Sequence, residues 1–164
     1  MLRVEKAIVV IAKIGVGVSF AVLIGAVLTQ VLGRTFGSSP VWTEELTRFA
    51  MLFTVAFGAG LALRSGDMVN VDIVCESLPG RWPWRLRLFS AAVTAVLCAI
   101  LIPAAWRYVS IGALQTSPAL GVRMNIIHFS VFALLVGLLL FAALRVVAMI
   151  WFGSEGQPHN RMDG

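Results

Sequence analysis

The side chains most able to take part in chemistry form one short cluster that comprises Trp42, Glu44, Glu45 and Arg48. Two carboxylates and a guanidinium so close together favour ion pairing, and on a helix the i, i+4 spacing lets Glu44 pair with Arg48. Glu45 is then left without an assigned partner. We weigh two interpretations of the cluster: a solvated helix start beneath an interfacial tryptophan, and a docking surface for another membrane subunit.

The other candidate side chains are isolated within apolar sequence. Lys13 and Arg145 lie near the ends of apolar runs, where long cationic side chains reach water by snorkelling, and we prefer this to an ion pathway. His128 has no second histidine in a neighbouring run to form a haem pair, so we expect a satisfied core or interfacial side chain. Cys75 and Cys98 are 23 residues apart with no ligand pattern beside them, which predicts neither a disulfide nor a metal site.

These side chains are set in an unusually apolar chain. Of its 164 residues 59% are hydrophobic and 13% are charged, and the mean hydropathy is +0.92, whereas soluble domains are roughly 45–50% apolar. Four apolar segments, about 8–32, 43–63, 88–109 and 126–151, are each long enough to cross about 30 Å of hydrocarbon. Since lipid offers no partner for a free backbone amide, each must be helical. The predicted fold class is all-α, an integral membrane protein with four transmembrane helices.

The connections between these segments carry membrane-surface signals. Residues 33–41 predict a tight turn with Ser39 as N-cap and Pro40 at the first helical position, so the second helix should start near residue 40. The fully apolar part of that span, 49–63, covers only about 22 Å, which draws the charged cluster toward the membrane boundary. Residues 68–78 alternate loosely between apolar and polar types and are compatible with a short interfacial amphipathic helix.

The positive charges predict an orientation. Of the 13 Lys and Arg, nine fall on the side that holds both chain ends and four on the other side. The positive-inside rule then places both termini in the cytoplasm, with residues 1–152 as one transmembrane domain and 153–164 as a polar cytoplasmic tail. The cations are scattered and form no patch with interleaved aromatic residues. We therefore expect membrane lipid as a partner and no nucleic acid.

Small residues recur at four-residue spacing in every apolar segment. Such stripes let helix backbones approach closely, and they either fill the core of the chain's own bundle or contact another subunit. The stripes are Gly17-Ala21-Gly25, Ala56-Gly60, Ala91-Ala95-Ala99 and Ala133-Gly137.

Four motifs in combination resemble a known family. They are Gly33-Arg34-Thr35-Phe36, Val41-Trp42-Thr43-Glu44-Glu45-Leu46-Thr47-Arg48-Phe49, Gly58-Ala59-Gly60-Leu61-Ala62-Leu63-Arg64 and Val71-Asp72. Their order over about residues 33–74 resembles the small membrane subunit of the tripartite ATP-independent periplasmic (TRAP) transporters. Length, four spans and predicted orientation extend the resemblance to nearly the whole chain. One departure is Met68, because members often have a histidine in this region.

The resemblance implies a multi-pass protein of a bacterial or archaeal inner membrane that is not an enzyme and needs no cofactor. It would act as a scaffold for a large multi-spanning subunit, in which the solute and sodium pathway lies. The complex would take up an organic acid delivered by a periplasmic solute-binding protein.

The resemblance, together with charge at the membrane boundary, also suggests roles for single residues. Trp42, Glu44, Glu45 and Arg48 would anchor the periplasmic end and face one of the two partner proteins. On the cytoplasmic side Arg64 would fix the connection to the third span by pairing with one of two carboxylates, Asp67 or Asp72. No catalytic, substrate-binding or metal-binding residue is assigned.

Three other functions are weaker fits to the sequence. An autonomous multidrug-type transporter working as a homodimer needs a carboxylate inside a span, and the apolar interiors contain none. A membrane anchor of a redox enzyme would usually carry two haem-ligating histidines on facing helices. A hydrolase or transferase would need a Ser, His and acid set or a phosphate-binding glycine loop. The small homodimeric transporter is kept as the alternative.

Overall fold

The computed structural model describes residues 2–38, 40–65 and 82–151, with side chains from Lys6 onward. Within these ranges the chain forms four helices, α1 (Leu2–Thr35), α2 (Trp42–Ser65), α4 (Trp82–Gly112) and α5 (Met124–Trp151). Each is long and apolar enough to cross a membrane, which confirms the predicted all-α fold with four membrane-spanning helices. Residues 68–78, which are compatible with an interfacial helix, and the predicted polar tail at 153–164 lie outside the described residues.

The helices are longer than the apolar segments that predict them. α1 has 34 residues and so extends about 51 Å, well beyond the roughly 30 Å of a hydrocarbon core. A helix can continue past the hydrocarbon because its amide groups remain paired within the helix itself. The apolar run therefore predicts the middle of each helix better than its ends.

The start of α2 differs slightly from the expectation. The helix begins at Trp42, two residues after Pro40, and Pro40 stands just outside it as a hydrogen-bond acceptor. Its carbonyl accepts from the N–H of Thr43 at 3.2 Å and from the hydroxyl of Thr43 at 2.6 Å. Thr43 is fully buried, so this turn is fixed in place. The proposed cap, Ser39, lies outside the described residues.

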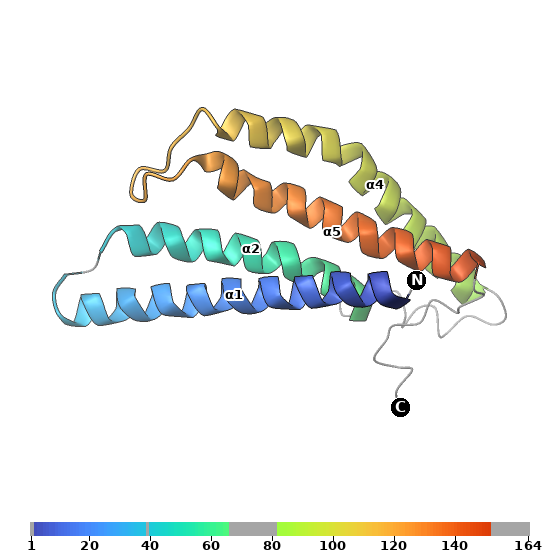
Figure 1. Ribbon diagram of the computed structural model, residues 1–164, viewed down its shortest axis with the longest axis horizontal. Coiled ribbons are helices and arrows are strands. Elements are labelled where there is room, and N and C mark those ends of the chain that lie inside the picture. The colour runs from blue at the N-terminus through green and yellow to red at the C-terminus, as the bar shows by residue number, and fades with distance from the viewer. Residues whose placement is uncertain (1, 39, 66–81, 152–164) are drawn as a thin grey trace.

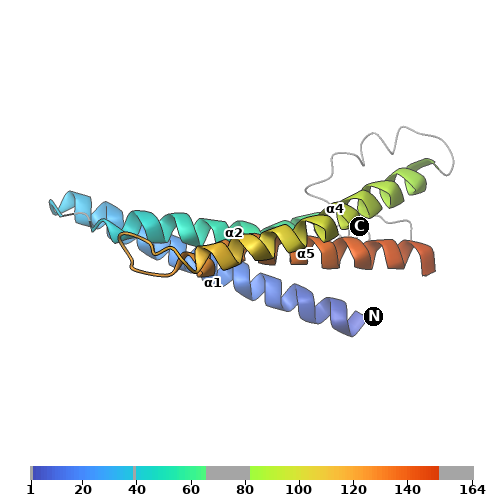
Figure 2. The same cartoon turned by 90° about the horizontal axis from the view of Figure 1, so that it is seen from above.

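The four helices form two hairpins, α1–α2 and α4–α5, which lie beside each other in one layer (Figure 1). α1 packs on α2, α2 on α5 and α5 on α4, so the spatial order is α1, α2, α5, α4. Loops 36–41 and 113–123 share one end of the layer, here called the loop end. Leu2 and Trp151 lie toward the opposite end, here called the terminal end. Figure 2 shows that α1 diverges from the other helices toward its N-terminus.

The contacts between helices are made largely by small residues. On α1, Ala12 and Ala26 are buried, and Gly15 lies against the ring of Phe57 on α2. Between α2 and α5, Gly60 lies against the ring of Phe141. Close backbone approach of this kind is typical of membrane helices, which gain little from hydrophobic burial when the solvent is lipid.

The small-residue stripes have different roles on different helices. Ala56 and Gly60 of α2 are buried within the chain, as expected for a stripe that fills the protein's own core. Gly17 and Gly25 of α1 are exposed, and a Cβ added at either would meet no atom within 4 Å. For α1 the core interpretation is wrong, because the buried residues of this helix include Val9, Ala12 and Ala26, and the stripe lies on another, exposed face.

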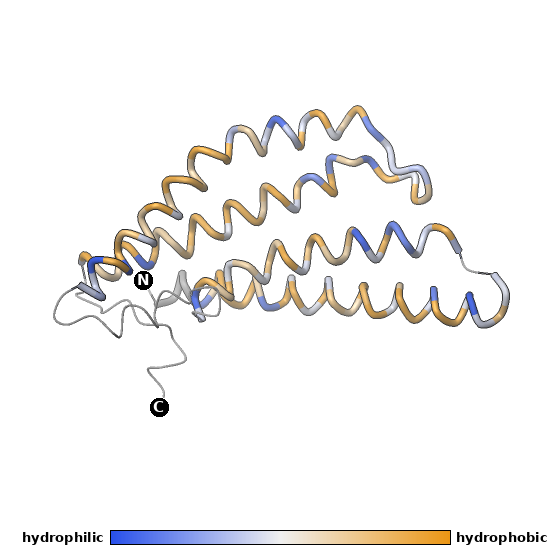
Figure 3. Tube along the Cα trace, turned by 180° about the vertical axis from the view of Figure 1, so that it is seen from behind, coloured by the Kyte–Doolittle hydropathy of each residue, from blue (hydrophilic) through white to orange (hydrophobic). Residues whose placement is uncertain are grey.

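The surface of the layer is mostly apolar. Figure 3 shows hydrophobic residues along all four helices and hydrophilic residues gathered near their ends and in the loops. Aromatic residues mark α4 at two levels, with Trp82 and Trp84 at its start and Trp106 and Tyr108 near its end. The 22 residues from Trp84 to Trp106 span about 33 Å, close to the thickness of a hydrocarbon core. Their spacing fits a pair of interfacial belts.

Candidate functional site

The main polar contact at the loop end joins the two hairpins and centres on Glu45. The Ser117 hydroxyl donates a hydrogen bond to the Glu45 carboxylate. The backbone N–H groups of Ala119 and Leu120 donate to the same carboxylate oxygen at 3.3 and 3.1 Å. We call Glu45 with these three donors the loop-end clamp. Glu45, which the sequence left without a partner, therefore finds its partners within its own chain.

The geometry of loop 113–123 directs all three donors toward α2. The Ser117 N–H bonds to the Val122 carbonyl at 2.8 Å, and the Met124 N–H bonds to the Gln115 carbonyl at 2.9 Å, so the loop folds back on itself. Gly121 allows the sharp turn because its φ of 65° is left-handed, a conformation that glycine adopts without steric cost. The folded loop exposes two successive N–H groups on one side, as in other turns that bind anions.

The clamp is well suited to hold the hairpins together. Hydrogen bonds that end on a carboxylate are stronger than those between neutral groups. Ser117 is only 3% exposed, so water has little access to its hydroxyl, whereas Glu45 is half-buried. Leaving such donors unpaired is costly when they are shielded from water. The arrangement supports a structural role, because one oxygen of the carboxylate accepts three hydrogen bonds from its own chain.

The neighbouring residues of the cluster have separate surroundings. Trp42 is the first residue of α2 and is 40% exposed. Glu44 is exposed and accepts a hydrogen bond of 3.5 Å from the Gln30 side chain of α1. Arg48 is exposed, and within the described residues no ion pair joins it to Glu44. The expected i, i+4 pair is therefore absent, since Glu44 turns to α1 instead.

Of the second predicted group, Arg64 lies within the described residues. Arg64 is in the last turn of α2 and is half-buried. Asp67 and Asp72 lie outside the described residues, so their pairing with Arg64 stays a prediction. The structure thus places Arg64 at the end of α2 opposite to Trp42, Glu44, Glu45 and Arg48.

A second contact, not predicted from the sequence, closes the α4–α5 hairpin beside the clamp. The His128 ring stacks on that of Tyr108, with centroids 3.8 Å apart, and His128 Nδ1 lies 3.1 Å from the Tyr108 carbonyl. His128 is 8% exposed, in agreement with the expected satisfied histidine. Gly112 makes room for this contact, because a Cβ there would overlap His128 Nδ1 and come within 2.8 Å of the Asn125 backbone nitrogen.

Some signals of the clamp were present in the sequence. Ser117-Pro118 followed by Gly121 is a turn pattern, and Glu45 stood without a partner. Their meeting across 72 positions could not be inferred from either pattern. Among the described residues, no three His, Cys, Asp or Glu side chains gather in a way that could hold a metal ion.

Comparison with known proteins identifies the family of this chain. The sequence profile of the family described as tripartite ATP-independent periplasmic transporters, DctQ component, matches residues 23–152. This range covers most of the chain. The chain belongs to the DctQ family.

A relative in Haemophilus influenzae supports the assignment of this DctQ chain. That protein is named "Putative TRAP transporter small permease protein" and is 24% identical over 132 residues, which cover 79% of this chain and 81% of the relative. The family match includes all of α2, α4 and α5, and with them the whole loop-end clamp. This DctQ chain is thus a multi-pass membrane protein of a family of transporter components.

Proposed function

We propose that this DctQ chain is the small permease subunit of a TRAP transporter in a bacterial or archaeal inner membrane, and that it acts as a scaffold. In this proposal it supports a large multi-spanning subunit that carries out sodium-coupled uptake of an organic acid, delivered by a periplasmic solute-binding protein. The observation that carries the proposal is the single-layer arrangement of the helices, which favours a supporting surface over a conduit.

A transport pathway through this chain would need polar side chains that converge near the middle of the membrane. In the layer, α1 packs on α2, α2 on α5 and α5 on α4. The carboxylates with described side chains are Glu44 and Glu45, both in the first turn of α2. This distribution supports a scaffold whose partner holds the pathway.

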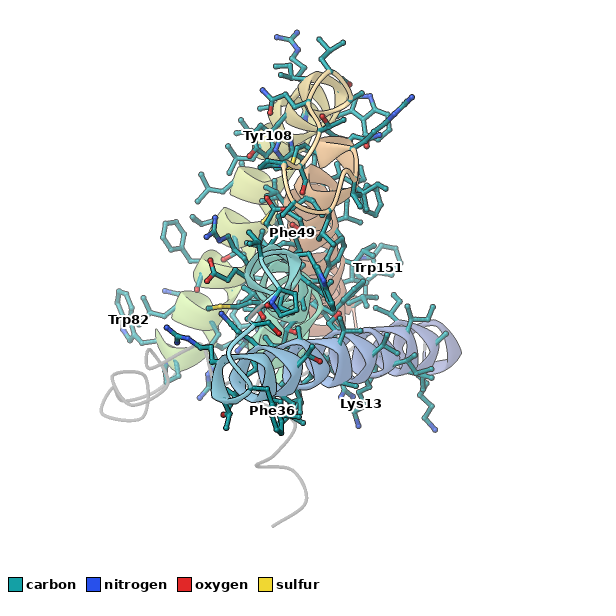
Figure 4. The ribbon with its side chains drawn as sticks, turned by 90° about the vertical axis from the view of Figure 1, so that its left-hand side faces the viewer. Lys13, Phe36, Phe49, Trp82, Tyr108 and Trp151 are labelled. Atoms are coloured by element: carbon teal, nitrogen blue, oxygen red, sulfur yellow. The ribbon has the colours of Figure 1, made fainter. Side chains whose placement is uncertain are left out.

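The faces of the layer supply surface for such a partner. On α1 the residues away from α2 are exposed and apolar, for example Ile14 and Val18, which is 59% exposed. Figure 4 shows Lys13 on the side of α1 that points away from the other helices. We propose that part of this surface packs on the large subunit and the remainder faces lipid.

The roles of the predicted cluster are now divided. We assign Glu45 to the clamp, because its Oε2 atom accepts three hydrogen bonds from loop 113–123. Trp42, Glu44 and Arg48 are exposed and remain the proposed partner-facing residues. The positive-inside rule supports a periplasmic loop end, where these residues would face the solute-binding protein or the outer rim of the large subunit.

Photo-crosslinking in the native host tests this proposal. A photoreactive phenylalanine analogue is placed at Val18 on α1 or at Leu114 in the loop, which is 88% exposed. We expect Val18 to crosslink to one large membrane protein and Leu114 to a soluble periplasmic protein. Ala142, which is 1% exposed, is the matched internal control and should give no intermolecular product. Products that contain only a second copy of this chain would instead support the homodimeric transporter.

A further inference from the structure

The two hairpins touch at two separate places along their length. One is the loop-end clamp, where Glu45 binds loop 113–123. The other lies in the later halves of α2 and α5, where Gly60 packs against Phe141 and close to the backbone of Gly137. Phe141 is buried at 6% exposure, so this second contact is closely packed.

Between these two places α5 is less completely covered, although Ala50, Ala56 and Ala59 of α2 are buried. No residue of α5 from Val131 to Leu140 is buried, although Ser130 and Phe141 on either side are. The ribbons of α2 and α5 also lie farther apart toward the loop end than toward the terminal end (Figures 1 and 3). The hairpins therefore diverge from a packed contact, and the clamp connects them again where they are widest apart.

We propose that Glu45 is a latch that sets the opening between the hairpins, with the Gly60–Phe141 contact as the pivot. When the latch is closed, loop 113–123 lies on the first turn of α2. When the carboxylate is removed, the loop end separates while the pivot keeps its packing. The proposal rests on the contacts within this chain alone and stands whether or not the proposed partners bind.

The distance along α2 from the pivot to the latch makes the opening measurable. The 15 residues from Glu45 to Gly60 span about 22 Å of helix, so a rotation of about 10° at the pivot would move the loop end by about 4 Å. The closed state depends on one side chain that offers an acceptor to three donors. A single substitution therefore removes the acceptor from all three hydrogen bonds.

Pulsed electron paramagnetic resonance on the full chain in lipid nanodiscs tests the latch. Spin labels are attached to a Val41→Cys, Leu114→Cys pair at the loop end or to a Val55→Cys, Leu140→Cys pair nearer the pivot. All four label positions are exposed. Cys75 and Cys98 are first replaced by alanine. Each pair is measured with Glu45 intact and with Glu45→Ala, Glu45→Gln, Ser117→Ala or Glu44→Ala.

With Glu45 intact we expect one narrow distance distribution at the loop end. Glu45→Ala should broaden it and add a population that is longer by several ångströms, while the Val55–Leu140 distances stay unchanged. Glu45→Gln and Ser117→Ala should give smaller shifts in the same direction, which keeps the test open if Glu45→Ala does not fold. Glu44→Ala is the matched control and should leave both pairs unchanged, because its hydrogen bond stays within one hairpin.

Two results would overturn the latch. Loop-end distances that are the same with and without the Glu45 carboxylate would show that other contacts set the opening. Equal broadening of both label pairs would show general loosening of the protein instead of rotation about a pivot.

Discussion

The Ser117 hydroxyl donates a hydrogen bond to the Glu45 carboxylate across 72 positions of the sequence, and this contact makes loop 113–123 part of the α2 surface. Ser117 also accepts a hydrogen bond of 3.2 Å from the Leu120 N–H, which donates to Glu45 as well. The Glu45 carboxylate, the Ser117 hydroxyl and the Leu120 N–H are therefore joined by hydrogen bonds in one network. Removal of one of these groups should therefore change how much the others contribute to the stability of the protein.

A double-mutant cycle on thermal stability in detergent measures this coupling. We expect Glu45→Ala and Ser117→Ala each to lower the melting temperature. The decrease in the double variant should be clearly smaller than the sum of the two single decreases. Residues that share one hydrogen-bond network are not additive, whereas distant residues are. The control cycle combines Glu44→Ala with Ser117→Ala and should be additive. Additive losses for Glu45 and Ser117 would show that their hydrogen bond contributes nothing to stability.

The close approach of α4 to α5 predicts a severe effect of one added methyl group. Gly112→Ala would place Cβ 2.8 Å from the backbone nitrogen of Asn125 and 3.0 Å from its Cα, and a backbone cannot move aside cheaply. We expect a loss of about 1–3 kcal/mol in unfolding free energy, the usual cost of overpacking. Gly25→Ala is the control, because a Cβ there meets no atom within 4 Å. Equal melting temperatures for the two variants would contradict the close α4–α5 contact at the loop end.

The proposed pivot can be tested in the same way. Gly60→Ala would bring Cβ to 2.7 Å from Phe141 Cδ2, so the variant should melt at a lower temperature. Adding Phe141→Leu should recover part of the loss, because the smaller side chain makes room. At Gly137 a Cβ meets no atom within 4 Å, and Gly137→Ala should be neutral. A Gly60→Ala variant as stable as the parent chain would rule out close packing of α2 on α5 at this point.

The sequence predicted the four helices because each contains an apolar run long enough to cross a membrane. It could not predict their order in the layer. All faces of a membrane helix can be apolar, so hydrophobic periodicity does not separate the face toward a neighbour from the face toward lipid. The stripe Gly17-Ala21-Gly25 illustrates this, since it has the spacing of a packing face but is exposed.

The sequence showed where the charged turn lies in the chain, but not which groups its side chains contact. The charged turn of α2 was evident from Glu44, Glu45 and Arg48 together. The spacing rule that paired Glu44 with Arg48 considers only one helix, and it failed because Gln30 of α1 is within reach of Glu44. The partners of Glu45 come from loop 113–123, which the same rule leaves out. Tertiary contacts across long stretches of sequence depend on how helices pack, which local patterns do not determine.

Thiol labelling tests the proposed orientation. In a chain without Cys75 and Cys98, Leu114→Cys should react with a membrane-impermeant maleimide added to cells with a permeabilised outer membrane, because the positive-inside rule places the loop end outside the cytoplasm. Ser154→Cys, which follows α5 in the sequence, should react only after the inner membrane is opened. The reverse pattern would show that both termini face the periplasm and that the proposed partner surfaces are on the wrong side.

The proposed subunit role is best tested by affinity purification of the tagged chain from its native membrane in mild detergent, with all partners identified and quantified by mass spectrometry. If the chain is the small permease subunit of a TRAP transporter, one large multi-spanning protein should be recovered in near-equal amount. Recovery of the chain alone, or only as a homodimer, would contradict this role and direct attention to autonomous transport.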